Sequence, residues 1–450
     1  MVFVFALFPN VALFPFIQAN NQPVAALIII GSWAFLSTGR VPVNRMVSFF
    51  YVLLGLLGIY GFLTLALSSG MADNREPGFV NYSAPPAEVV LTFVSYLIGP
   101  IIFLFLLYNF RRVRPGAIKA FIVVQFSVCL GQMFASGFIG PLFDATLGTF
   151  FVGFSSQRYT LGRGVAGTFP EPSHLGRYVV VALGLLFIYR HRKQITEGEF
   201  KLYSVLTVGL LLMNQSLTGL VILLAWLIGQ LVLHWASGNV VRGGALTTLL
   251  MLGIAAVMLA PETARWSTVG DKVSALAAVS ADLNPLDLQI LGGIRLIHML
   301  VGYGSILIFP FGQGLGSYLH NLPETAVRLG IDIQQASFYR NVVADVGLEN
   351  VITKPNGYGA QLAYDMGILG LIPVIMLTVA ILRVSTRALP YGASWWTLPI
   401  IGLVLVLFYT TTTLPVPWIL LAFIAFYPGM PPSRESEAHP IVGRRREVPR

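Results

Sequence analysis

Long apolar runs recur along the chain, and their length restricts the fold more than any other feature. A helix needs about 20 apolar residues, with a range of about 17–25, to cross the hydrocarbon core of a bilayer. Segments approaching this length lie near residues 2–18, 24–39, 46–67, 89–110, 118–136, 177–189, 200–215, 217–235, 244–260, 361–382, 395–412 and 414–428. The sequence therefore predicts an all-α, polytopic integral membrane protein with about 12 transmembrane helices.

The composition agrees with a surface that faces lipid. Hydrophobic residues make up 56% of the 450 residues and charged residues 10%, whereas soluble domains carry about 25% charged residues. So few charges cannot cover a water-facing surface, and we expect residues 1–433 to form a single membrane domain. Cys129 is the only cysteine, which excludes a disulfide within the chain and a cysteine-based metal site.

One apolar stretch departs from the pattern of spans. Residues 137–154 contain Gly140, Pro141 and Asp144, which interrupt the apolar run. Non-helical backbone is tolerated at membrane depth only where protein buries it. We therefore expect this stretch to be a re-entrant or interfacial segment.

Basic residues are distributed unevenly among the connecting segments. If both termini lie on one side, that side contains most of the 28 Lys and Arg residues but few of the 19 Asp and Glu residues. Because Lys and Arg gather in cytoplasmic loops, both termini are predicted to be cytoplasmic. The net charge of +9 then reflects topology and indicates no nucleic-acid partner. Residues 434–450 are predicted to form a disordered basic tail on the cytoplasmic side.

Two outer loops hold the remaining charges, at about 155–176 and 261–360. The second is far longer than most loops between spans, and long loops are usually functional. Its apolar spacing predicts short helices, one of them interfacial at 271–283. Arg295 and His298 are three residues apart, so they share a face if their segment is helical.

Several motifs of soluble enzymes are absent. The chain has no DxD, HExxH or GxSxG motif, so no metal site and no cofactor is expected. The run GQGLGSY at 312–318 lacks the spacing of a nucleotide-binding loop. Because glycine adopts positive φ without strain, a turn is the better interpretation.

The outer arginines and carboxylates suggest a chemistry. Arginine binds diphosphate with two parallel hydrogen bonds and stays charged at any biological pH. A carboxylate such as that of Glu171 can accept a proton from an attacking hydroxyl. Together they suit glycosyl transfer from a lipid-linked diphosphate without a metal. The alternative is that Arg163, Glu171 and Arg177 form ion pairs that fix a loop.

Three stretches carry a resemblance to a family. They are GTFPEPSHLGRY at 167–178, LIFPFGQGLGSY at 307–318 and NGYGAQLAYDMGILGL at 356–371. They resemble, respectively, the Glu-Pro-Ser turn before an inner helix, the glycine-rich turn after an apolar run, and the segment leading into the helix after the large periplasmic loop. In this order, they are similar to motifs of the O-antigen and exopolysaccharide polymerases, within the O-antigen ligase and polymerase superfamily.

The resemblance implies an activity and a location. The family transfers a growing glycan from undecaprenyl diphosphate onto a carrier-linked repeat unit, at the periplasmic face of the bacterial inner membrane. The expected partners are the undecaprenyl-diphosphate-linked oligosaccharide and membrane lipids, with a chain-length regulator protein as a further candidate.

The same resemblance implies roles for individual residues. The Glu-Pro-Ser match assigns catalysis to Glu171, with His174 and Arg163 beside it. Periplasmic arginines match the family only as a class. The candidate substrate-binding residues are Arg158, Arg177, Arg265, Arg295, His298, His320, Arg328, Arg340 and Asp365.

One position departs from the ligase members of the superfamily. Their histidine ahead of the late helix corresponds to Asn356, and asparagine cannot act as a general base. This difference favours a polymerase over ligase-like glycosyl transfer. Two alternatives from other classes stay open: a transporter or flippase for lipid-linked sugars, and a non-catalytic scaffold. Asp144 and Asp365 are the charges that a transporter would use.

Overall fold

In this computed structural model, the residues described are 7–8, 45–70, 86–109, 114–134, 139–151, 154, 164–169, 171–214, 216–236, 294–331, 357–388, 401–402, 405–409 and 416–426. Every regular element within these ranges is helical. The longer helices are α3 (Arg45–Gly70), α4 (Pro86–Asn109), α5 (Pro115–Met133), α7 (Pro172–His191), α8 (Glu197–Asn214), α9 (Leu217–Ala236) and α16 (Tyr358–Ala388). The shorter ones are α6 (Ile139–Phe150), α13 (Ile294–Gly304), η3 (Ser305–Leu307), α14 (Tyr318–Arg328), η7 (Leu405–Tyr409) and α18 (Val416–Phe426).

Five helices of the described chain are long and apolar enough to cross a membrane. Their apolar stretches are Ser48–Ala66, Val89–Leu107, Pro115–Met133, Pro172–His191 and Tyr358–Arg383, and each falls within a span expected from the sequence or overlaps it. The coarse prediction of an all-α membrane protein is therefore confirmed. The full set of about 12 spans stays a prediction. The spans expected at 24–39 and 244–260 lie outside the described residues.

Several helices begin at a proline residue, and one begins with a capping box. Pro86, Pro115 and Pro172 each open their helix, where a missing N–H group costs no hydrogen bond. In front of α8, the Thr196 hydroxyl accepts from the Glu199 N–H group (3.2 Å), and the Glu199 carboxylate accepts from the Thr196 N–H group (2.9 Å). This reciprocal pair is a capping box.

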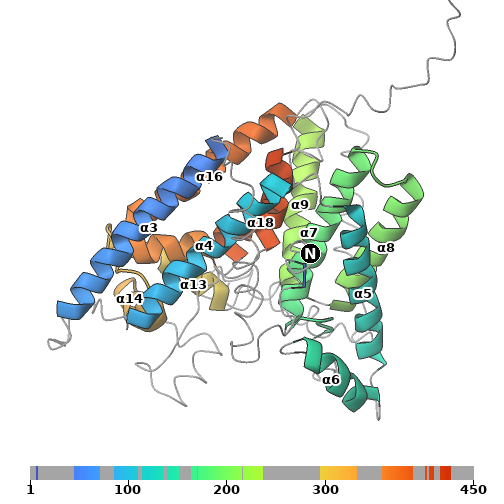
Figure 1. Ribbon diagram of the computed structural model, residues 1–450, viewed down its shortest axis with the longest axis horizontal. Helices are drawn as coiled ribbons and strands as arrows, with labels where there is room; N and C mark the ends of the chain where they lie inside the picture. Colours follow the sequence, from blue (N-terminus) through green and yellow to red (C-terminus); the bar gives the residue numbers. More distant parts are fainter. Residues whose placement is uncertain are drawn as a thin grey trace, which may run out of the picture.

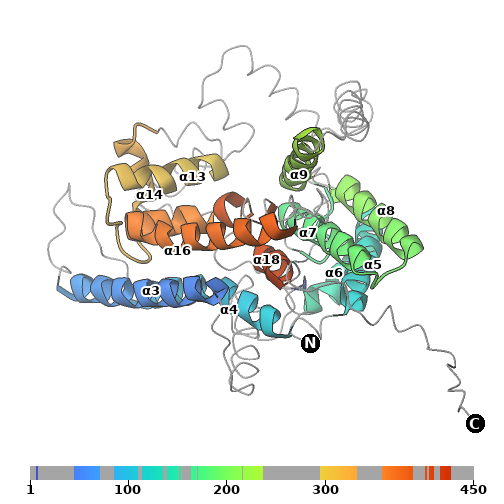
Figure 2. The same cartoon turned by 90° about the horizontal axis from the view of Figure 1, so that it is seen from above.

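The helices form two groups joined by α18 (Figure 1). In the first group α16 lies between α3 on one side and α13 with α14 on the other (Figure 2). In the second group α7 packs against α5, α8 and α9. Helix α18 contacts α4 and α16 of the first group and α7 of the second, so it carries the contact between them.

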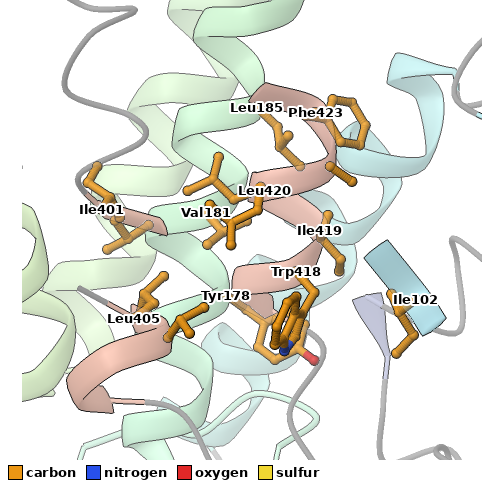
Figure 3. Packing of buried hydrophobic residues seen from close by; sticks show 14 of the residues in the cluster. Ile102, Tyr178, Val181, Leu185, Ile401, Leu405, Trp418, Ile419, Leu420 and Phe423 are labelled. Atoms are coloured by element: carbon orange, nitrogen blue, oxygen red, sulfur yellow. The ribbon is translucent and has the colours of Figure 1, made fainter. Parts of the chain in front are cut away.

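Trp418 of α18 is the centre of the contact with the first group. Its ring stacks on Phe49 of α3 at 6.3 Å and meets the edges of Phe103 of α4 and Tyr358 of α16. A Cβ atom on Gly99 would lie 1.9 Å from the indole nitrogen, so α4 and α18 approach closely only because residue 99 is glycine. On the other side of α18, apolar side chains of α7 and α18 turn toward one another (Figure 3).

The stretch 137–154, which we expected to be a re-entrant or interfacial segment, is helical over most of its length, and its position relative to a membrane stays a prediction. Residues 139–150 form α6, a helix of 12 residues. Gly140 and Pro141 stand near its start, where they cost little, because the first N–H groups of a helix have no partner within it. Phe143 of α6 then lies against Gly131 of α5, where a Cβ atom would come within 2.3 Å of its ring.

Candidate functional site

Two of the three motif segments from the sequence bind each other directly. The Gln313 N–H group donates to the Tyr364 carbonyl (3.1 Å), and the Gly314 N–H group donates to the Asp365 carbonyl (2.9 Å). In return, the Ile368 N–H group donates to the Pro310 carbonyl at 2.9 Å. We call this contact between residues 310–317 and 364–368 the glycine clasp. It makes one structural unit out of two segments that are distant in the sequence.

Two glycines make the clasp sterically possible. Gly367 has φ 62° and ψ −141°, which interrupts the helical path of α16, and a Cβ atom there would lie 2.0 Å from the Pro310 carbonyl oxygen. At Gly312 (φ 78°), a Cβ atom would lie 2.4 Å from the Asp365 carbonyl oxygen. Gly314 and Gly316 also have positive φ. The prediction that GQGLGSY forms turns is therefore confirmed.

Asp365 is fully buried beside the clasp. The Tyr96 hydroxyl of α4 donates to its Oδ2 atom at 2.7 Å, and the Tyr358 hydroxyl donates to the Tyr96 carbonyl at 2.9 Å. The Oδ1 atom has no hydrogen-bond partner among the described residues. The N–H groups of Gly316 and Tyr318 lie near the carboxylate, at the start of α14. A carboxylate is stabilised there by the positive end of the helix dipole.

His298 belongs to the same neighbourhood. The Tyr318 hydroxyl donates to the His298 carbonyl at 3.2 Å, and the two rings are 5.9 Å apart. Tyr318 also packs edge-on against Tyr364 at 4.7 Å. The Tyr364 hydroxyl in turn pairs with the Thr325 hydroxyl at 2.7 Å. The structure thus brings together His298 and Asp365, two of the predicted binding residues, through Tyr318 and the clasp.

The segment before α7 forms a second polar region, inside the other helix group. Residues 164–169 are all buried, although they carry no regular helix. Amide side chains from two neighbouring helices bind their backbone: Gln125 and Gln132 of α5, and Asn214 of α8. We call these three residues the amide clamp.

The catalytic candidates follow this buried segment directly. Glu171 is exposed, stands at the residue before α7, and accepts a hydrogen bond from the Ser173 hydroxyl (3.2 Å). His174 is half-buried in the first turn of α7. Arg177 is buried with 1% of its surface exposed, so it lies inside the helix group. The structure therefore places His174 and Arg177 in the first turns of α7, and Glu171 directly before this helix.

The other predicted residues are scattered. Arg328 of α14 pairs with Glu324 at 2.7 Å and lies over the Phe309 ring. Arg295 lies in α13 with His298, as the shared-helix prediction expected, and His320 lies in α14. The remaining candidates lie outside the described residues; they are Arg158, Arg163, Arg265 and Arg340. The predicted interfacial helix at 271–283 also lies outside the described residues.

The sequence did not identify the residues that hold these candidates in position. Tyr96 supports Asp365, and the amide clamp supports the segment before Glu171. A signal was present for the clamp, because Gln125 and Gln132 stand in an otherwise apolar span and a buried amide needs partners. The two polar regions lie in different helix groups, and α18 packs between their helices α7 and α16.

The opposite ends of α5, α7 and α8 are rich in ion pairs. Lys119 pairs with Glu199, and Arg190 pairs with Glu197 at 2.8 Å and lies over the Phe200 ring at 4.4 Å. The hydrogen bond from Lys119 is the main cause that lowers the pKa of Glu199 below its ordinary value. These charged residues lie at the end of α7 that is opposite to Glu171. One end of α7 therefore carries ion pairs, and the other end carries the catalytic candidates.

No protein-family model matches the sequence, and no curated protein matches it significantly. Within the described residues, no group of three or more His, Cys, Asp or Glu side chains is arranged to hold a metal ion.

Proposed function

We propose that the protein is a polysaccharide polymerase. It transfers a growing glycan from undecaprenyl diphosphate onto a lipid-linked repeat unit, at the periplasmic face of a bacterial inner membrane. The observation that carries the proposal is the glycine clasp. Two segments that resemble polymerase motifs are joined there by three backbone hydrogen bonds, and a buried carboxylate stands beside them.

The chemistry assigns one role to each kind of group. A hydroxyl of the acceptor sugar attacks the anomeric carbon of the glycan and loses its proton to Glu171. The bond from that carbon to the diphosphate oxygen breaks, and undecaprenyl diphosphate leaves as the anion. Arginines of the outer segments neutralise its charge, and Arg163 stands eight residues before Glu171 in the sequence. No step requires a metal ion, so we expect activity in the presence of a chelator.

The distribution of charge supports the proposed orientation. The ends of α5, α7 and α8 that carry Lys119, Arg190 and Lys201 belong to the cytoplasmic side, as basic residues next to spans do. Glu171 stands at the other end of α7, and Asp365 lies near the start of α16. Both regions then belong to the periplasmic half of the protein.

A flippase for lipid-linked sugars is the second candidate. Asp365 favours it, because a buried carboxylate beside an interrupted helix is typical of transport sites within the membrane. Such a protein would move the carrier-linked repeat across the bilayer and would extend nothing.

A reconstituted assay separates the two candidates. The full chain is placed in vesicles with a synthetic carrier-linked repeat unit and a chelator, and both glycan length and movement of the lipid are measured. We expect extension by the native protein and its loss in Glu171→Gln and Arg163→Ala. Glu197→Gln is the matched control, because Glu197 stands near the opposite end of α7 and pairs with Arg190.

The outcomes point in different directions. Extension that survives Glu171→Gln would remove that residue from the mechanism. Movement of the lipid without extension would replace the polymerase with the flippase. Extension that stops when a chelator is added would contradict the metal-free chemistry.

A further inference from the structure

The segment from Gly164 to Phe169 is unusual for the interior of a helical membrane protein. All six of its residues are buried, yet none belongs to a helix that could bind its N–H and C=O groups internally. Buried backbone groups without partners are costly. The position of this segment therefore depends on the side chains that supply those partners.

Gln132 binds the middle of the segment as a neighbouring strand would. Its Oε1 atom accepts from the N–H groups of Ala166 (3.2 Å) and Gly167 (2.9 Å), and its Nε2 atom donates to the Gly167 carbonyl at 3.0 Å. An amide offers both an acceptor and donors on one planar group, which an apolar residue of the same size lacks.

Gln125 and Asn214 bind the two sides of the same segment. Gln125 accepts from the Thr168 N–H group at 3.0 Å and donates to the Thr168 hydroxyl at 2.6 Å. Asn214 donates to the Val165 carbonyl at 2.6 Å and also to the Pro172 carbonyl at 2.9 Å. Pro172 is the neighbour of Glu171, so the last of these bonds fixes the backbone next to the exposed carboxylate.

The segment and the start of α7 are closely packed. Gly167 has φ 61°, and a Cβ atom there would lie 2.2 Å from the Gln125 Oε1 atom. Further along, Gly176 of α7 and Gly219 of α9 approach so closely that a Cβ atom on either would come within 3.1 Å of the other's Cα atom. The start of α7 is thus held on both sides, by amide hydrogen bonds before Glu171 and by glycine packing after it.

We propose that Gln125, Gln132 and Asn214 are positioning residues for the glycosyl-transfer reaction. They hold the segment 164–169 inside the membrane domain and thereby set where Glu171 meets the acceptor hydroxyl. This inference rests on the proposed function for its catalytic part. Its structural part, that the amide clamp keeps the segment buried, is tested without any substrate.

The chain contains its own reporter for the clamp. Cys129 is the only cysteine, is fully buried on α5, and its sulfur lies 3.4 Å from the Cβ position of Gly167. Departure of the segment would uncover this thiol. The rate at which N-ethylmaleimide labels Cys129 in the full chain, held in lipid nanodiscs, therefore measures how often the segment opens.

The decisive variant is Gln132→Met, which keeps the side-chain volume but removes all three hydrogen bonds. Because several hydrogen bonds to the segment are lost together, we expect labelling to accelerate tenfold or more. In the extension assay we expect kcat to fall by a similar factor with little change in KM, because substrate binding is kept and the base is displaced. Gln194→Met is the matched control, since Gln194 is exposed beyond the far end of α7.

A second variant controls for the possibility that Gln132→Met disturbs the folding of α5. Thr168→Val changes the segment alone and removes the hydroxyl that accepts from Gln125, while the bond from the Thr168 N–H group to Gln125 remains. We therefore expect a smaller acceleration of labelling in a helix group that stays intact. Labelling of both variants at the native rate would overturn the clamp. Fast labelling with native kcat would overturn the positioning role and leave the segment merely structural. A native protein that extends no glycan would overturn the proposed function and the positioning role together, while the labelling rates would still judge the clamp.

Discussion

Gly367 and Gly330 both have a left-handed backbone, but their surroundings differ. Gly367 (φ 62°) lies against the Pro310 carbonyl, whereas at Gly330 (φ 72°) a Cβ atom would meet nothing within 4 Å. We expect Gly330→Ala to cost about 1–2 kcal/mol of unfolding free energy, from backbone strain alone. Gly367→Ala adds steric overlap within the clasp and should cost more than about 3 kcal/mol. Thermal unfolding in detergent compares them, and equal losses would show that the clasp adds nothing.

Tyr96 is the residue on which the buried carboxylate most depends. Tyr96→Phe leaves the Asp365 Oδ2 atom without the hydroxyl that donates to it at 2.7 Å. A buried acceptor that loses its donor costs about 1–3 kcal/mol, so we expect a clear fall in melting temperature. Tyr51→Phe is the control, because Tyr51 is 49% exposed on α3. An unchanged melting temperature in Tyr96→Phe would mean that Asp365 needs no partner from α4.

At the scale of elements, the pair of Lys119 on α5 and Glu199 on α8 gives a pH dependence. Because the folded pKa of Glu199 is lowered, the pair stabilises the protein above the ordinary pKa of a glutamate. That stabilisation is lost as the pH falls through the lowered pKa. We expect Lys119→Met to reduce the melting temperature slightly at pH 7, as surface pairs contribute little, and by less near pH 3. Melting curves at both pH values test this, and a difference that persists undiminished in acid would assign the effect to packing.

Elements were easier to predict from the sequence than their contacts. Apolar length predicted α3, α4, α5 and α16 closely, because lipid selects for runs of a fixed length. The helix α6 was not predicted, because the cost of Pro141 depends on its place within a helix and the start of α6 is not marked by composition. The glycines of 312–316 indicated a turn, but nothing local identified α16 as its partner. Arg177 was grouped with the outer arginines as a binding candidate, but its burial could not be predicted, since it depends on the helices around α7.

At the scale of the whole molecule, the two ends of the helix groups should lie on opposite sides of the membrane. Gln194 stands between α7 and α8 among basic residues, and Val327 is 61% exposed on α14. In a Cys129→Ser background, we expect Val327→Cys to react with a membrane-impermeant maleimide added to intact cells. We expect Gln194→Cys to react only after the cells are opened. Labelling of both from outside would reject the proposed orientation.

The glycine clasp has a consequence for how such a chain can change during evolution. Because the Gly314 N–H group is bound to the Asp365 carbonyl, the two ends of the chain between these residues are held together. Extra residues inserted between those two anchors lengthen a loop that is already closed, and the entropic cost of a longer loop grows only slowly. We therefore expect inserted residues between these anchors to leave the membrane-spanning helices undisturbed. Recombination between related genes could then exchange this stretch and keep the membrane-spanning helices unchanged.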